Sequence, residues 1–209
     1  MTEHVILLHG LWMRGIALQL LGRRLLRAGY AVETFDYASV FGGSDAAIAR
    51  LRARLHAIDA DNVHLVGHSL GALVALEAVR GEHELPLGRI VCLGPPLRGS
   101  AVARAVARVP GGRLLLGNGA ERLLAGIAAW SEVCRVGVIA GRLPLGLGAW
   151  VGALTAPHDG TVSVEETRLP GIADHRTVAV SHTGLLFSAE VADFTIGFLR
   201  NGRFAPARA

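Results

Sequence analysis

The sequence contains no lysine, so all 21 of its basic residues are arginines. Charged residues make up only 18% of the 209 positions and hydrophobic residues 51%, which argues against a disordered chain. A net charge of +4 would suit an anionic partner, either nucleic acid or a membrane surface. The arginines are scattered, however, and no nucleic-acid-binding module is recognisable. We therefore predict no nucleic-acid partner, and contact with a membrane surface stays open.

Cysteine is also scarce. Cys92 and Cys134 both lie in apolar runs, which favours inert core thiols over a disulfide bond or a zinc site. No secretory-type leader precedes the first apolar run, and no uncharged apolar run reaches membrane-spanning length. No cluster of potential ligands has metal-site spacing. These absences predict a cytoplasmic protein with no metal site.

The remaining pattern alternates short apolar runs with helical periodicity, and the length suits one domain over residues 1–209. We expect strands at 5–8, 31–35, 63–66, 90–93, 133–140 and 177–180. Helices are expected at 16–28, after a cap at Ser44 or Asp45, at 70–80, and from about 191 to 201. This alternation predicts a mostly parallel six-stranded sheet with helices on both faces. Residues 97–130 break the rhythm and predict a small helical insertion after the fourth strand.

The sharpest local motif is Gly67-x-Ser69-x-Gly71. Chance would supply about 0.13 such matches in a chain with 27 glycines and 8 serines, so its context must decide. The motif follows a predicted strand and opens a predicted helix, which is the setting of a nucleophile elbow. There the serine sits on a sharp turn whose glycines avoid collisions with neighbouring backbone. Ser69 is therefore the candidate nucleophile.

A serine hydroxyl needs a base to remove its proton. Hydrolases with such an elbow place their histidine late in the chain, after the last strand. His182 meets this condition, because it follows the sixth predicted strand and precedes the last helix. His175 is the competitor, and we place it before that strand in a loop over 171–176.

The acid that orients the histidine should follow the fifth strand. Asp159, in the turn-like pair Asp159-Gly160, is our candidate. Asp174 stands much closer to the histidine in sequence, and Glu165 and Glu166 fall on a predicted helical turn. We therefore expect the triad to be Ser69, Asp159 and His182.

Backbone N–H groups must also face the oxygen that becomes negative in the tetrahedral intermediate. Leu70 follows the nucleophile at a helix N-terminus, where the helix dipole favours negative charge. Leu11 follows His9-Gly10 at the end of the first strand. We predict that the N–H groups of Leu11 and Leu70 form an oxyanion hole and that His9 orients the loop.

Together, His9-Gly10, Gly67-His68-Ser69-Leu70-Gly71, Asp159-Gly160 and His182 resemble the α/β-hydrolase superfamily over nearly the whole chain. The segment 94–100 is similar to a strand-to-loop segment of bacterial lipases and lipid deacylases, although Pro95-Pro96 replaces the commoner Thr-Pro-His. The resemblance implies a minimal six-stranded α/β-hydrolase fold that begins at the strand before the oxyanion loop. It also implies hydrolysis of carboxylic esters through an acyl-enzyme, without metal or organic cofactor.

The leading hypothesis is an esterase or lipase acting on a small-molecule or lipid acyl ester with an apolar acyl group. Leucines in residues 97–130 would form an apolar wall or lid over Ser69, or would simply pack on the sheet. An acyltransferase or thioesterase with the same triad is the alternative. A non-catalytic binding protein is the rival from another class. The sequence leaves the oligomeric state open.

Overall fold

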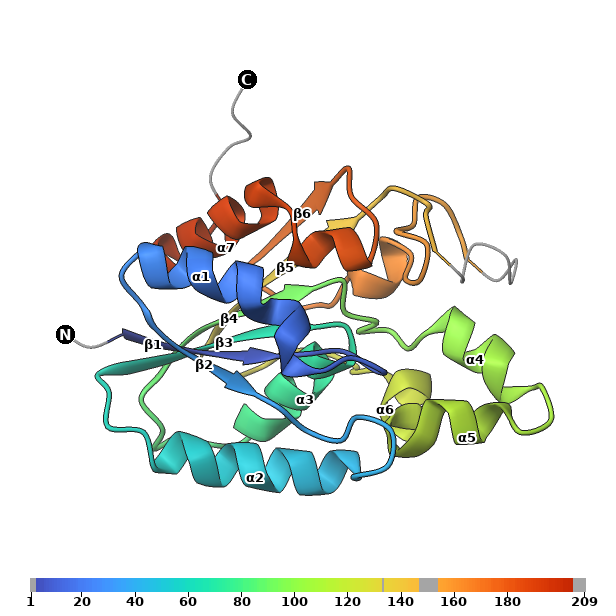
Figure 1. The fold of residues 1–209 in the computed structure, drawn as a ribbon, viewed down its shortest axis with the longest axis horizontal. Coiled ribbons are helices and arrows are strands. Elements are labelled where there is room, and N and C mark those ends of the chain that lie inside the picture. The colour runs from blue at the N-terminus through green and yellow to red at the C-terminus, as the bar shows by residue number, and fades with distance from the viewer. Residues whose placement is uncertain (1–2, 133, 147–153, 205–209) are drawn as a thin grey trace.

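The computed structural model describes residues 3–132, 134–146 and 154–204. Its centre is a sheet whose strands are all parallel, in the order β2-β1-β3-β4-β5-β6 (Figure 1). The strands are β1 (Glu3–Leu8), β2 (Ala31–Phe35), β3 (Asn62–His68), β4 (Leu87–Leu93), β5 (Arg135–Gly141) and β6 (Asp174–Val178). The predicted six-stranded sheet is therefore confirmed.

The boundaries of β6 differ from the prediction. This strand begins at Asp174, so His175 lies within it and not in the loop expected before it. The apolar pattern that located the strand covers only its end, because β6 is an edge strand and its first four residues are not fully buried. An edge strand can carry polar residues at little cost, so the apolar pattern of the sequence does not mark where this strand begins.

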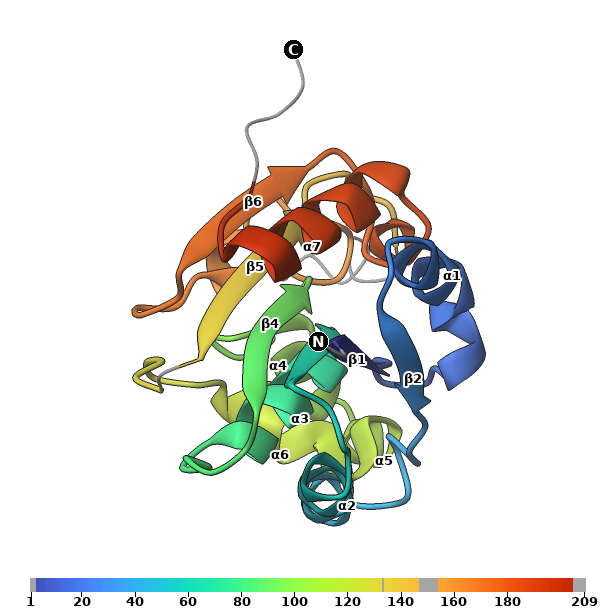
Figure 2. The ribbon, with the colours of Figure 1, turned by 90° about the vertical axis from the view of Figure 1, so that its left-hand side faces the viewer.

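Helices cover both faces of the sheet (Figure 2). On one face lie α1 (Gln19–Arg27) and α7 (Ala189–Asn201), and on the other lie α2 (Ser44–His56) and α3 (Leu70–Val79). A short 3-10 helix, η1 (Gly15–Leu18), precedes α1 where one continuous helix was expected. The predicted cap of α2 was wrong: Gly43 is the N-cap residue, and the Ser44 hydroxyl donates a hydrogen bond to the carbonyl oxygen of Asn118.

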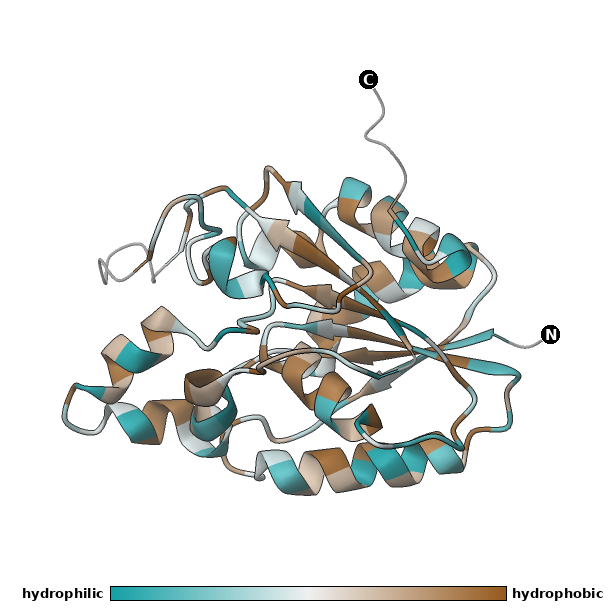
Figure 3. Cartoon of the chain, turned by 180° about the vertical axis from the view of Figure 1, so that it is seen from behind, coloured by the Kyte–Doolittle hydropathy of each residue, from teal (hydrophilic) through white to brown (hydrophobic). Residues whose placement is uncertain are grey.

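The all-apolar strands fit this arrangement because both faces of the sheet are buried (Figure 3). Ile6 and Leu8 of β1 pack with α2 and α3, whereas Val5 and Leu7 pack with α1 and α7. Successive side chains of a strand point to opposite faces, so a continuous apolar run serves two cores. Burying each such side chain contributes roughly 1.5–3 kcal/mol.

A helical segment follows β4, as predicted. It comprises α4 (Ala101–Ala107), α5 (Gly112–Leu116), the 3-10 turn η2 (Gly117–Gly119) and α6 (Ala120–Ala125). In Figure 1 this segment lies beyond the carboxyl ends of the central strands. Loops that follow β1, β3, β5 and β6 reach the same edge of the sheet, which is where parallel sheets place their ligand sites.

The sequence predicted inert cysteine thiols and no membrane-spanning helix. Cys92 and Cys134 are both free, and burial raises the pKa of each thiol, that of Cys134 to about 12. A raised pKa leaves less of the reactive thiolate, in line with the expectation of inert thiols. Among the described residues, no helix combines the length and apolar character needed to cross a membrane.

Candidate active site

Ser69 stands on a strained turn between β3 and α3. Its φ of 53° and ψ of −121° are unusual for a residue with a side chain. A Cβ on Gly67 would lie 2.5 Å from the Ala72 Cα, and one on Gly71 would lie 2.5 Å from the His9 carbonyl oxygen. Both glycines are required because backbone occupies the space that a side chain would need. This is the predicted elbow geometry.

Backbone strain gathers at this edge of the sheet. Among the described residues other than glycine, only Ser69 and Trp12 have a positive φ, and the value for Trp12 is 59°. Such conformations cost about 1–3 kcal/mol each and persist only where the surrounding structure holds them. Trp12 belongs to the loop after β1, so the turn of Ser69 and the predicted oxyanion loop are both strained.

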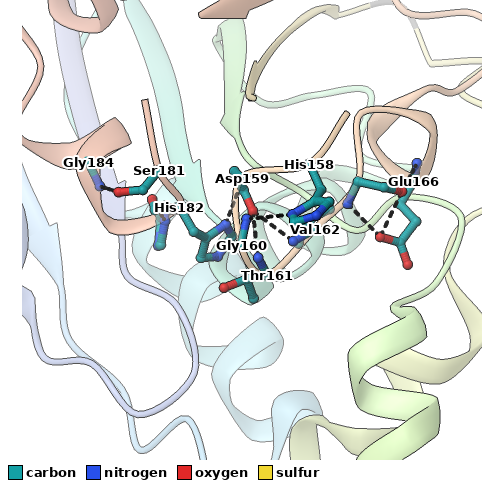
Figure 4. Close-up of polar contacts among 11 residues, drawn as sticks. His158, Asp159, Gly160, Thr161, Val162, Glu166, Ser181, His182 and Gly184 are labelled. Carbon is teal, nitrogen blue, oxygen red and sulfur yellow. Dashed lines mark hydrogen bonds and ion pairs between the residues drawn. The ribbon is translucent and has the colours of Figure 1, made fainter. Parts of the chain in front are cut away.

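Asp159 and His182 form a buried pair (Figure 4). The His182 Nδ1 lies 2.7 Å from the Asp159 Oδ2, and the backbone N–H of His182 donates to the Asp159 carbonyl oxygen at 2.9 Å. The other carboxylate oxygen accepts hydrogen bonds from the backbone N–H groups of Thr161, at 2.9 Å, and Val162, at 2.7 Å. Asp159 is only 1% exposed, so these contacts satisfy a carboxylate that water does not reach.

His68, the residue before Ser69, brings the loop of His182 against the turn of Ser69. Its ring nitrogen Nε2 lies 3.1 Å from the His182 carbonyl oxygen, and the two imidazole rings have centroids 4.6 Å apart. Complete burial, aided by the nearby His182, lowers the pKa of His68 to about 3, so its ring is neutral. His182 and Ser69 both line one cavity at this edge.

The competing residues lie elsewhere. Asp174 and His175 occupy the beginning of β6, at the amino ends of the parallel strands. Ser69 lies at the other end, directly after the carboxyl end of β3. Asp174 accepts a hydrogen bond from the Phe204 backbone N–H, and His175 Nε2 lies 2.8 Å from the Thr167 hydroxyl. These contacts are structural, and neither residue lines the cavity of Ser69.

Glu166 has a role that the sequence reading missed. Glu166 lies in the 3-10 turn η4 (Glu165–Thr167) and makes reciprocal hydrogen bonds with Ser163, in the pattern of a capping box: its carboxylate accepts from the Ser163 N–H at 2.7 Å, and its own N–H donates to the Ser163 hydroxyl at 3.2 Å. The same carboxylate accepts the Ala101 N–H at the start of α4. Glu166 therefore links the loop of Asp159 to the helical segment. The Ser-x-x-Glu spacing was the available signal.

The two predicted oxyanion donors lie on either side of Ser69. Leu70 is the first residue of α3, where N–H groups have no partner within the helix. Leu11 lies in the loop after β1 and lines the cavity. A Cβ on the preceding Gly10 would lie 3.1 Å from the Ser69 Cβ, so this loop passes directly beside Ser69.

The cavity has a volume of about 460 Å3 and a largely apolar lining. The helical segment supplies much of that lining: Ser100, Val102, Ala103, Val106, Leu115, Leu116 and Leu123. Leu116 and Leu123 are buried, whereas Leu114 points away and is 79% exposed. The segment therefore forms a wall of the cavity, and only some of its leucines contribute to it. No group of His, Cys, Asp or Glu in the described ranges is arranged to hold a metal ion.

Comparison with known proteins identifies the family of this chain. A model of the alpha/beta hydrolase family matches residues 5–201. The chain belongs to this family. No individually curated protein sequence matches this alpha/beta hydrolase.

Solved structures share the fold of this alpha/beta hydrolase at low sequence identity. The mature lipase BlEst2 of Bacillus licheniformis is 18% identical with a TM-score of 0.77, and the match covers 95% of this chain and 91% of that one. An esterase from Exiguobacterium antarcticum is 14% identical with a TM-score of 0.65, covering 95% and 92%. The type II thioesterase BorB from the borrelidin biosynthetic cluster is 18% identical with a TM-score of 0.62, covering 95% and 92%.

Proposed function

We propose that this protein is a serine esterase or lipase that hydrolyses carboxylic esters with an apolar acyl group through an acyl-enzyme on Ser69. The buried pair of Asp159 and His182, of which His182 lines the same apolar cavity as Ser69, carries this proposal. The fold shared with a lipase and an esterase supports it.

In the proposed acylation, the Ser69 oxygen attacks the ester carbonyl carbon and its proton passes to Nε2 of His182. The carbonyl oxygen becomes negative and faces the backbone N–H groups of Leu11 and Leu70. The bond to the alcohol oxygen then breaks, and His182 donates its proton to that oxygen. The alcohol leaves and the acyl group stays on Ser69.

Deacylation repeats these steps with water. His182 takes a proton from a water molecule, whose oxygen attacks the acyl carbon, and the bond to Ser69 breaks as His182 returns the proton to the serine oxygen. The carboxylic acid leaves. Throughout, Asp159 keeps the His182 Nδ1 protonated, so that Nε2 is free to act as the base.

The substrate preference follows from the cavity wall. Residues of α4, α5 and α6 present aliphatic side chains toward Ser69, and each buried methylene of an acyl chain gains roughly 0.8 kcal/mol. An apolar acyl chain therefore suits this wall better than a charged or sugar-like group.

The proposal is tested by covalent labelling and by matched substrates. A fluorophosphonate should label Ser69, and Ser69→Ala should lose both the label and turnover, up to about a millionfold. Ser100 lines the same cavity and is the matched control, so Ser100→Ala should keep the label. Persistent turnover in Ser69→Ala would overturn the proposal, and so would a wild-type protein with neither label nor turnover.

A second comparison separates ester from thioester cleavage. Oxygen esters and thioesters of the same acyl chains, with and without added alcohol, should show hydrolysis of the oxygen ester as the main reaction. A strong preference for the thioester, or for transfer to the alcohol, would contradict the assignment as an esterase while leaving Ser69 as the nucleophile.

A further inference from the structure

Asp36 touches both ends of the loop that passes beside Ser69. In the register of the sheet, Leu8 of β1 pairs with Phe35 of β2, so the next residues of the two strands, His9 and Asp36, emerge at the same edge. Asp36 Oδ1 lies 2.9 Å from His9 Nε2 and 3.3 Å from the Gly15 N–H nitrogen. One carboxylate oxygen therefore contacts the residue before loop 10–13 and a residue after it.

The second oxygen holds the same loop from its far end. Asp36 Oδ2 accepts hydrogen bonds from Arg14 Nε, at 3.0 Å, and from the terminal NH2 of Arg14, at 2.7 Å. Such a two-pronged pair fixes orientation as well as distance. Partial burial alone would raise the pKa of Asp36, but the hydrogen bonds from Arg14 and Gly15 outweigh it and lower the pKa below its usual value. Asp36 is therefore an anion, which suits it to accept the hydrogen bonds from Arg14 and Gly15.

The loop between these contacts needs such a restraint. Trp12 has its φ of 59° here, a conformation that relaxes when the surroundings do not hold it. A further tie lies at the start of the loop, where the Tyr37 hydroxyl donates to the His9 carbonyl oxygen at 2.8 Å. The loop lines the cavity of Ser69, so a change in its backbone would move the Leu11 N–H relative to the reacting carbonyl.

We propose that Asp36 is a positioning residue, whose carboxylate clamps both ends of loop 10–13 and thereby aims the Leu11 N–H at the developing oxyanion. This inference rests on the proposed function. It adds a residue that directly follows β2, on the far side of β1 from the strand before Ser69, to the groups on which the rate depends.

Asp36→Asn tests the clamp. An amide has only one acceptor oxygen, so its NH2 group must face either Arg14 or Gly15, and the hydrogen bonds donated from that side are lost. Removing an oxyanion donor outright costs about 10²–10³ in kcat, so misaiming one should cost roughly 10–100-fold. KM should stay within about twofold, because the donor acts in the transition state.

Inhibitor binding supplies a readout that general loosening would not give. A trifluoromethyl ketone forms a tetrahedral adduct with Ser69 and places an anionic oxygen in the hole, so its affinity should fall by the same factor as kcat. The affinity of the matched ether, which forms no adduct, should stay unchanged.

Glu33 provides the matched control. It lies on β2, three residues before Asp36, and accepts a two-pronged pair from Arg54, at 3.0 and 2.7 Å, but does not line the cavity. Glu33→Gln should leave kcat within about twofold. Arg14→Gln is a second test should Asp36→Asn fail to fold, because the Arg14 side chain is 77% exposed. It should show a smaller loss of kcat, again without a change in KM.

The outcomes separate the two proposals. Wild-type turnover and labelling at Ser69 test the esterase function alone. With these present, a wild-type kcat in both Asp36→Asn and Arg14→Gln would overturn the clamp. So would a loss that appears in KM instead of kcat, or an equal loss in Glu33→Gln.

Discussion

Replacing Asp159 by asparagine is the sharpest test of the proposed triad, because the structure dictates how the new amide must sit. Oδ1 accepts two backbone N–H groups, from Thr161 and Val162, while Oδ2 faces His182 Nδ1. An asparagine that turned its NH2 toward the two N–H groups would leave them buried without partners, at about 1–3 kcal/mol each. The amide oxygen therefore keeps that place, and the NH2 group faces His182.

This orientation disables the base. His182 can then only accept a hydrogen bond at Nδ1, so its proton moves to Nε2 and the nitrogen that should receive the Ser69 proton is occupied. The charge that would stabilise the imidazolium is lost as well. We expect kcat to fall about 10⁴-fold, as the equivalent change does in a serine protease. That factor corresponds to about 5.4 kcal/mol of transition-state stabilisation.

The assay is turnover of a chromogenic ester at saturating concentration, with the unfolding midpoint measured in parallel. Asp174→Asn is the matched control, because Asp174 also accepts two backbone N–H groups, from His175 and Phe204, yet stands at the opposite edge of the sheet. It should keep kcat within about twofold. An inactive Asp174→Asn beside an active Asp159→Asn would refute the assignment of the acid.

Three further predictions concern the wall, the elbow and pH. Leu116→Ala should lower kcat/KM for decanoyl esters by about tenfold more than for acetyl esters, since a few methylene contacts are lost, while the exposed Leu114→Ala should change neither. Gly71→Ala should lower the free energy of unfolding by several kcal/mol in urea titrations, because its Cβ would meet backbone at 2.5 Å, whereas Gly197→Ala, in open space on α7, should stabilise by up to about 1 kcal/mol. Burial lowers the pKa of His175 to about 4. Between pH 6.5 and 4, the His175 ring is therefore protonated in the unfolded chain but not in the folded chain. The melting temperature should therefore fall as the pH is lowered through this range, and a His175→Gln variant with the same slope would contradict the reasoning.

The sequence alone predicted the candidate site where residue order and local sterics decide it. Gly67 and Gly71 are required because a Cβ at either position would lie 2.5 Å from a backbone atom. The elbow motif can therefore be recognised without the fold. The apolar runs predicted the strands because both faces of the parallel sheet are buried. His182 and Asp159 could be ranked by chain order, since loops after successive parallel strands reach the same edge.

Only the tertiary structure decided what depends on contacts between distant segments. The 2.7 Å pairing of His182 with Asp159, the choice of Leu116 over Leu114 for the cavity wall, and the link from Glu166 to α4 all join parts of the chain that periodicity treats separately. Asp36 is the clearest case. In sequence it is a polar residue after a strand, and nothing local marks it. Its role arises from the strand register, which sets it beside His9 and lets one carboxylate hold both ends of a loop.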